Sequence, residues 1–350
     1  MVRRIAFAVP GDLATPTGGY AYDRRMIAEL EKLGWQIDVV ALGDGFPRPS
    51  AAQRAGALAR LMEIPIGRAV VVDGLALGVL PEAAKQVAAG HALVALVHHP
   101  LAFESGLSPE QADAMRASER AALAAAKRVI VTSPATARVL AAEYGVPENR
   151  IVVAVPGNDS VPLAQANNGG VIRLLAIGSI VPRKGFDVLI AALATLTDLP
   201  WHLTIAGDRT RNSKAAAQLD ADIARFDLGG RVTVLGAVTD EKIAELYAAA
   251  DLFTLASRYE GYGMAFSEAI ARGVPVIATT AGAIPETVPA DAGLLVPPDD
   301  IAAFAGALRT AIANPDERQR MAAAARDAAR KLPAWQTSAK LFSDALEAAL

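Results

Sequence analysis

The chain has 350 residues, of which 53% are hydrophobic and 20% are charged, and this composition excludes extensive disorder. Its length exceeds the size at which a single core stops growing, so we expect two domains. A formal net charge of −3 gives no electrostatic reason for binding nucleic acid. The absence of cysteine excludes disulfides, thiolate catalysis and cysteine metal sites, and it suits a reducing cytoplasm, where we expect the protein to work.

The N-terminus carries Arg3 and Arg4 ahead of an apolar run that ends at Pro10. This run is too short for a signal peptide, and no small-residue cleavage site follows it, so it predicts a first buried strand. No apolar segment of the sequence reaches the length that crosses a bilayer. We therefore expect any membrane contact to be peripheral.

Apolar runs typical of buried strands alternate with alanine-rich helical segments through the first half of the chain. The expected strands are 5–9, 37–41, 69–72, 93–97, 129–132 and 151–153, and the expected helices include 22–33, 80–88, 109–125 and 134–144. Parallel strands need crossover connections and are covered on both faces, so this order predicts a doubly wound, Rossmann-like α/β domain.

A segment without apolar periodicity separates this half from the next. It runs from Pro156 to Pro162 and continues through the polar stretch 165–170, which makes it the expected interdomain linker. We therefore expect an N-terminal domain over 1–165 and a C-terminal domain over 166–333. The last segment, 334–350, has the pattern of an amphipathic helix.

The same alternation restarts after the linker. Strands are expected at 173–177, 202–206, 232–235, 252–255, 274–278 and 293–296. Ligands of open α/β sheets bind beyond the carboxyl ends of the strands. Two such domains would present their loops to a shared central cleft.

The most informative motif is the stretch from Ser257 to Glu268, which reads SRYEGYGMAFSE. Gly261 and Gly263 permit a tight turn and a close backbone approach to a ligand, and the free amides at the start of the following helix favour a phosphate. Glu260 and Glu268 flank this turn. Since carboxylates repel phosphate, we expect them to accept hydrogen bonds from hydroxyls on either side of it, as in a nucleotide sugar.

A second motif, GSIVPRKG, directly follows the first strand of the second half. Gly178 permits a turn at the strand end, and Arg183 and Lys184 supply two cations suited to a diphosphate. The motif is neither a P-loop nor a dinucleotide glycine fingerprint. Taken alone, a solvated basic turn would explain it as well.

The order of these motifs resembles the donor half of the family 4 retaining glycosyltransferases, which have the GT-B fold. The resemblance covers about 170–290 and is carried by the elements described above, by Gly207 and by the later Gly273-Val274-Pro275 and Ile284-Pro285-Glu286. It is weaker in the first half, where acceptors bind. By this resemblance, the last helix would pack back on the N-terminal domain.

The resemblance also implies roles for matching residues. Glu268 would accept hydrogen bonds from the ribose and Glu260 from the donor sugar. The backbone around Gly263, Met264 and Ala265 would face phosphate or sugar, while Arg183 and Lys184 would balance the leaving diphosphate. Many members carry arginine immediately after the equivalent of Gly178, but here Ser179 stands there. Either Arg183 supplies the missing charge, or the phosphate is held more weakly.

In the first half, Gly18 and Gly19 follow the first strand and resemble the glycine pair that faces the diphosphate in the family, although a plain turn is the alternative. His98 and His99 follow the strand expected at 93–97. No carboxylate or third histidine completes an obvious metal set with them, so we expect no metal site. The resemblance assigns the contact with the donor sugar to His98, with His99 as the alternative.

Three other polar residues receive simpler interpretations. Glu104, just beyond the histidine pair, is either an acceptor contact or a solvated loop carboxylate. His91 and His202 have no comparable setting and are expected to be structural.

The resemblance implies transfer of a hexosyl group with retained configuration by front-face substitution, from a UDP-sugar in preference to a GDP-sugar. It requires no cofactor, because Arg183 and Lys184 can neutralise the leaving group without a metal. The acceptor stays open among small molecules, glycans and lipids. A noncatalytic sugar-nucleotide-binding protein on the same fold is the alternative. A nicotinamide-dependent dehydrogenase would need a Gly-x-Gly-x-x-Gly turn after a first strand, and neither half of the sequence has one there.

Overall fold

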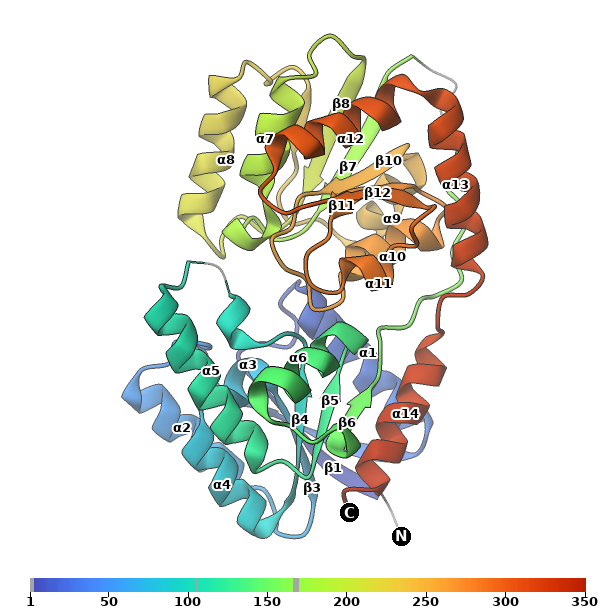
Figure 1. The fold of residues 1–350 in the computed structure, drawn as a ribbon. Helices are drawn as coiled ribbons and strands as arrows, with labels where there is room; N and C mark the ends of the chain where they lie inside the picture. The colour runs from blue at the N-terminus through green and yellow to red at the C-terminus, as the bar shows by residue number, and fades with distance from the viewer. Residues whose placement is uncertain (1–2, 105, 166–169) are drawn as a thin grey trace. The chain divides into compact units, whose positions relative to one another are not determined.

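The computed structural model describes residues 3–104, 106–165 and 170–350 (Figure 1). The chain divides into two compact units, with Met1–Gly157 and Pro333–Leu350 in unit 1 and Asn158–Leu332 in unit 2. Unit 2 thus begins before the boundary expected after 165. The reason is local, because the backbone amides of Ala164 and Gln165 donate to the carbonyls of Arg272 and Ala248 within unit 2. The rest of the expected linker, 166–169, lies outside the described residues.

Unit 1 is built on a six-stranded sheet in the order β2-β1-β3-β4-β5-β6, with every neighbouring pair parallel. Its strands are β1 (Arg3–Val9), β2 (Trp35–Ala41), β3 (Ala69–Asp73), β4 (Ala92–Val97), β5 (Arg128–Val131) and β6 (Ile151–Val153). Its helices are α1 (Gly18–Lys32), α2 (Ala51–Met62), α3 (Gly74–Leu77), α4 (Pro81–Gly90), α5 (Pro109–Ala124), α6 (Pro134–Tyr144) and α14 (Trp335–Glu347). Strands β3 and β4 are buried along their whole length, as expected for a parallel sheet covered on both faces.

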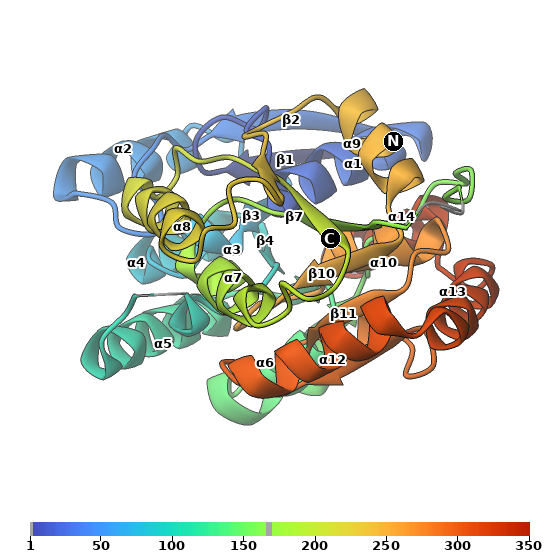
Figure 2. The ribbon, with the colours of Figure 1, turned by 90° about the horizontal axis from the view of Figure 1, so that it is seen from above.

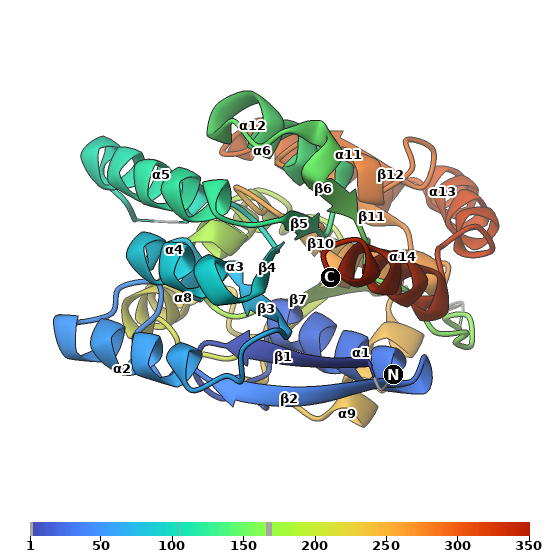
Figure 3. The same cartoon turned by 90° about the horizontal axis from the view of Figure 1, so that it is seen from below.

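Helices cover both faces of this sheet. Helices α2, α4, α5 and α6 pack in a row on one face, while α1 and α14 pack against each other on the other (Figure 3). Phe342 of α14 stacks on Phe7 of β1 with ring centroids 6.4 Å apart. The indole of Trp35 donates to the Ser343 hydroxyl at 2.9 Å. The chain's last helix is therefore part of the core of unit 1.

Unit 2 repeats the architecture with a second parallel sheet in the order β12-β11-β10-β7-β8-β9. Its strands are β7 (Ile172–Ile177), β8 (Trp201–Ala206), β9 (Val232–Val234), β10 (Leu252–Leu255), β11 (Val276–Thr279) and β12 (Gly293–Val296). Its helices are α7 (Phe186–Ala194), α8 (Ser213–Arg225), α9 (Asp240–Ala249), α10 (Met264–Ala271), α11 (Ile284–Thr287), α12 (Ile301–Ala313) and α13 (Pro315–Ala329). Helix α7 packs against α8 and α12, and α10 packs against α13 (Figure 2).

The strand order reverses beside β1 in unit 1 and beside β7 in unit 2, which is where open α/β sheets bind ligands. Every expected strand is present, which confirms the α/β class. Helix α1 begins at Gly18, earlier than expected, because the Thr17 hydroxyl caps it by accepting from the Tyr20 amide. Helix α2 was not among the helices expected. Within the described ranges, no helix combines the length and the apolar character needed to cross a membrane.

Candidate functional site

The motif after β7 meets the motif after β10 in unit 2. Lys184 Nζ lies 2.7 Å from Glu260 Oε1, and Arg183 Nη1 lies 3.3 Å from Glu260 Oε2. The Ser257 hydroxyl donates to Glu260 Oε1 at 2.6 Å. Burial opposes ionisation of Glu260, but Lys184 and then Arg183 outweigh it and lower its pKa to about 2. The two predicted cations and one predicted carboxylate thus form one charged cluster.

Two predicted donor-binding glycines lie in close contact at this end of the sheet. A Cβ on Gly207 would lie 1.8 Å from the carbonyl oxygen of Gly178, so a side chain there is excluded. A Cβ on Gly178 would lie 3.2 Å from Cε of Lys184, whose stem crosses this glycine. Gly207 therefore lets the two backbones meet, and Gly178 leaves room for the Lys184 stem. The contact of either glycine with a donor stays a prediction.

Arg183 has a more specific setting than a free cation. Its Nη1 donates to the Tyr259 carbonyl oxygen at 2.8 Å in addition to its contact with Glu260. Its buried Nε has no hydrogen-bond partner among the described residues. Arg183 therefore holds the backbone at Tyr259 and the carboxylate of Glu260. The sequence did not indicate this pairing. Whether Arg183 also replaces the positive charge that many family members carry at the position of Ser179 stays a prediction.

The glycine turn ahead of α10 adopts the conformation that the motif predicts. Gly261 and Gly263 are buried, and Gly263 has φ 90°, in the region that favours glycine. An added Cβ there would lie 2.6 Å from the Phe266 ring and 3.7 Å from Cβ of Glu260. Helix α10 starts directly afterwards, so the amides of Met264 and Ala265 belong to the first turn, where amides have no intrahelical acceptor.

Glu268 stands apart from the Glu260 cluster, within α10 and half-buried. Burial raises its pKa, against the opposing effects of the Tyr247 hydroxyl and Arg272. Arg272 donates to the backbone carbonyl of Glu268 at 3.1 Å. The two glutamates of the motif therefore have different surroundings, one neutralised by cations and the other beside a phenol.

In unit 1, Gly18 and Gly19 form the first turn of α1 rather than a loop before it. A Cβ on Gly19 would lie 3.3 Å from Cδ2 of His98, which is tighter than most real contacts. The glycine packs directly against the imidazole. Gly19 therefore has a packing reason in addition to the ligand contact that the resemblance implies.

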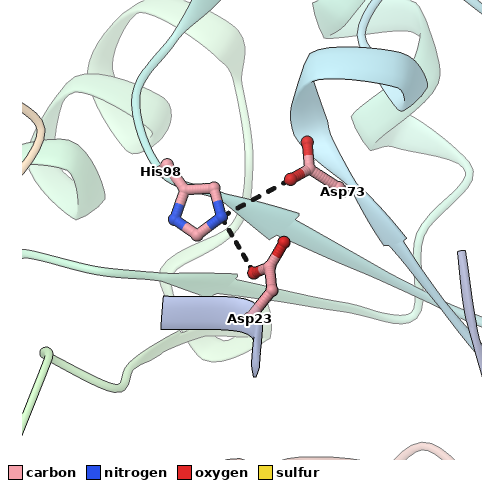
Figure 4. Close-up of side chains that lie close together, drawn as sticks. All are labelled: Asp23, Asp73 and His98. Carbon is pink, nitrogen blue, oxygen red and sulfur yellow. Dashed lines mark hydrogen bonds and ion pairs between the residues drawn. The ribbon is translucent and has the colours of Figure 1, made fainter. Parts of the chain in front are cut away.

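His98 lies at the carboxyl end of β4 beside two aspartates that the sequence analysis missed (Figure 4). His98 Nε2 is 3.1 Å from Asp23 Oδ1 and 3.5 Å from Asp73 Oδ2. The expectation that no carboxylate would complete a set with the histidines is wrong, since the three side chains lie close enough to share a cation. Asp73, the last residue of β3, was a usable signal, because it directly follows the apolar run expected at 69–72. Asp23, inside a helix, offered none.

The other histidines lie in different surroundings. His99 Nε2 lies 2.5 Å from Glu104 Oε1, so Glu104 is a partner of this histidine rather than a solvated carboxylate. His91 is buried next to the end of α4, and His202 shares a hydrogen bond with Thr233 on the adjacent strand. Both have structural settings, as expected.

Two family models match the chain. The model described as "Glycosyl transferases group 1" matches residues 163–328, and "Glycosyltransferase Family 4" matches residues 73–160. A D-inositol 3-phosphate glycosyltransferase of Rhodococcus erythropolis is 30% identical over 255 residues, which are 66% of this chain and 58% of that protein. The chain spans about three fifths or less of the first curated relatives that it matches.

Solved structures agree in fold. The sucrose-phosphate synthase of Thermosynechococcus elongatus superposes with a TM-score of 0.82 at 22% identity, over 98% of both chains. HepE of Anabaena, in complex with UDP-glucose, gives a TM-score of 0.80 at 21% identity over 99% of both chains. Together with the two family models, which between them match most of the sequence, they lead to one conclusion: the chain belongs to the family 4 glycosyltransferases and has the GT-B fold.

Proposed function

We propose that this protein is a retaining glycosyltransferase that moves a hexosyl group from a nucleotide-diphosphate sugar, with UDP-sugars favoured over GDP-sugars, to an acceptor hydroxyl. The observation that carries the proposal is the buried cluster of Glu260, Lys184 and Arg183 beside the first turn of α10. The relatives support it by name, since they include a mannosylfructose-phosphate synthase and a protein crystallised with UDP-glucose.

Each part of the donor has a matching group in this assignment. The amides of Met264 and Ala265 hold phosphate oxygens, because the start of a helix favours an anion. Lys184 and Arg183 balance the diphosphate, and Glu260 accepts from hydroxyls of the sugar. Glu268 accepts from hydroxyls of the ribose. Gly261 and Gly263 allow the backbone to approach the donor closely.

The remaining assignments rest on the family. His98 contacts the donor sugar, while Gly18 and Gly19 face the diphosphate. Gly178 and Gly207 complete the donor site from the ends of β7 and β8.

The proposed chemical step is a front-face substitution, as the family resemblance implies. The bond between the anomeric carbon and the leaving phosphate oxygen breaks as the acceptor oxygen bonds to the same face of that carbon. The acceptor's proton passes to the departing phosphate. The growing negative charge is stabilised by cations and amides that are already in place, so little reorganisation is needed during the reaction. Because two cations neutralise the leaving group, we propose that the reaction needs neither a metal nor another cofactor.

The acceptor is a small molecule, a glycan or a lipid, and we place the reaction in the cytoplasm with at most peripheral membrane contact. No nucleic acid takes part. The cysteine-free composition is compatible with that compartment.

The test has two stages. A panel of sugar nucleotides is screened by thermal shift, since a ligand that binds only the native state raises the melting temperature. The stabilising donor is then incubated with Lys184→Ala and Glu268→Ala, which are expected to lower kcat/KM by tenfold or more. Lys242→Ala is the matched control, because Lys242 also pairs with a glutamate but is exposed. Near-normal activity in both site variants would contradict the assignment. Donor binding without transfer to any acceptor would favour the noncatalytic alternative.

A further inference from the structure

In unit 1, two buried aspartates, Asp23 and Asp73, accompany His98. A histidine that only contacts a sugar does not require them. Both carboxylates approach the same ring nitrogen, Nε2, while Nδ1 points away from them (Figure 4). Asp23 is fully buried and Asp73 almost so, whereas His98 keeps 18% of its side chain exposed. The Nε2 edge of the imidazole is therefore held inside the unit, while part of the side chain remains exposed.

Contacts from α1 and from the ends of β3 and β5 fix this geometry. Asp23 projects from α1, and Asp73 caps α3 by accepting from the Leu75 amide through its other oxygen. The carbonyl of His98 accepts from the Thr132 hydroxyl at the end of β5. The Tyr22 ring meets the imidazole edge-on at 5.4 Å, and Gly19 packs against Cδ2. The ring therefore has little freedom to turn.

The charges around the imidazole decide its protonation. From α1 it faces Asp23 and the Tyr22 phenol, whose hydroxyl donates to the Ala154 carbonyl and so remains protonated. From the end of β3 it faces Asp73, and β5 contributes only the Thr132 hydroxyl. Among the described residues Asp23 Oδ2 has no hydrogen-bond partner, and burial raises the pKa of Asp23 to about 7, an effect that His98 opposes and Asp73 reinforces. Two buried carboxylates around one nitrogen favour a proton on that nitrogen and a positive charge on the ring.

We infer that Asp23 and Asp73 are positioning residues that hold His98 as an imidazolium, whose Nδ1–H is a fixed hydrogen-bond donor to an oxygen of the bound sugar. A neutral imidazole with its proton on Nε2 could only accept at Nδ1, so the aspartates decide whether His98 donates or accepts. The binding of a sugar at His98 rests on the proposed function, whereas the charge of the ring does not.

The balance of effects on His98 agrees with this inference. Burial alone would lower its pKa, but Asp23 and Asp73 outweigh burial and raise the pKa to about 10. The group would stay charged through neutral pH, where an ordinary histidine loses its proton. The donor at Nδ1 would then be independent of pH over the range in which most enzymes work.

NMR of the full chain with 15N-labelled histidine tests the ring directly. The chain has four histidines, so a His98→Gln variant identifies the signal of His98 and the others serve as references. We expect the wild-type His98 ring to stay protonated from pH 6 to pH 8.5. Asp23→Asn and Asp73→Asn should each lower its titration midpoint by about one pH unit or more, and Asp23→Asn should have the larger effect. Asp113→Asn, an exposed aspartate on α5, is the matched control.

Two results would overturn the inference. One is a titration midpoint of the His98 ring that lies below pH 7 in the wild type, or that is the same in the wild type and in both aspartate variants. The other is stoichiometric binding of Zn²⁺, Mn²⁺ or Mg²⁺ with loss of the Nε2 proton, abolished by Asp23→Asn, because the group would then be a cation site. Should Asp23→Asn fail to fold, Asp73→Asn carries the comparison alone.

A kinetic measurement connects the ring to the reaction. In the variants whose His98 ring loses its proton at a lower pH, kcat/KM should fall as pH rises from 7 to 8.5. The kcat/KM of the wild type should stay constant over that range. An aspartate variant whose pH profile matches that of the wild type would contradict the functional part of the inference. If the wild type transfers no sugar, the proposed function fails, but the NMR titration still decides the charge of His98.

Discussion

At the scale of single residues, the buried carboxylates of this protein differ in what neutralises them. Glu260 has two cations and a hydroxyl, and its pKa falls to about 2. Glu119 on α5 is equally buried but has no cation beside it among the described residues: it accepts from the Leu101 amide at 2.9 Å, and the nearby Tyr144 hydroxyl only partly offsets burial. Burial therefore dominates at Glu119 and raises its pKa to about 8. The first carboxylate is an anion at neutral pH, whereas the second is protonated.

This difference makes the stability of unit 1 depend on pH through Glu119. In the unfolded chain Glu119 loses its proton near pH 4.3, while the folded protein keeps it up to about pH 8. Between these values the unfolded state binds fewer protons, so rising pH favours unfolding. We expect the stability of Glu119→Gln relative to wild type to increase by a few kcal/mol from pH 5 to pH 8, measured by urea denaturation. The exposed control Glu82→Gln should show no such trend, and a constant difference for Glu119→Gln would contradict the expectation.

The charged clusters also mark what the sequence could predict at this scale. Arg183, Lys184 and Glu260 lie in loops after neighbouring strands, so their meeting at one edge of the sheet followed from the parallel order. Their mutual pairing did not, because a sequence does not reveal which counterion a cation selects. The role of Asp23 could not be predicted from the sequence, because a single acidic residue within a helix is usually exposed to solvent, and only the packing of the folded chain buries this one.

At the scale of elements, glycines determine how two helices begin. Gly263 ends its turn with a positive φ ahead of α10, which motif analysis anticipated. Gly18 and Gly19 instead lie within α1, because the Thr17 cap lets the helix start earlier than the alternation of apolar residues suggested. Periodicity locates the strongly apolar strands well, whereas a cap is a single side-chain contact that shifts a boundary without changing the pattern.

Gly19 provides a test of the contact between α1 and His98. Glycine to alanine inside a helix normally gains about 0.5–1 kcal/mol, and Gly56→Ala in α2 should do so because an added Cβ there meets no atom within 4 Å. Gly19→Ala should show no net gain, because its Cβ displaces the His98 ring. Thermal denaturation of both variants measures the difference. An equal gain in both would mean that the ring moves aside freely.

At the scale of the whole molecule, each unit has its own sheet and its own core. The apolar order of strands and helices specifies these two sheets, so the fold class could be read from the sequence. Which unit receives the last helix could not be derived from its apolar pattern, since an amphipathic face can pack on either sheet. The ring contacts of Phe342 and Trp335 with Phe7 and Tyr22 decide that assignment in the structure.

Removing one of these contacts should weaken one unit selectively. Phe342→Ala is expected to cost unit 1 about 3–5 kcal/mol, the usual loss for a buried phenylalanine. Hydrogen exchange should then show faster exchange in β1 and β3 than in wild type, with β7 and β10 unchanged. Phe304→Ala, which removes an equally buried ring from α12, should give the opposite pattern. Matching losses in both sheets for either variant would contradict separate cores.

The return of the chain to unit 1 has a consequence for synthesis. Unit 2 is inserted between β6 and α14, so the first sheet leaves the ribosome long before the helix that covers Phe7. Unit 2 can finish folding while the part of that sheet that α14 covers is still bare. Domains generally fold as units in the order in which they are made. Here the unit that is started first is the last to be completed, and a chaperone has an apolar surface to bind in the interval.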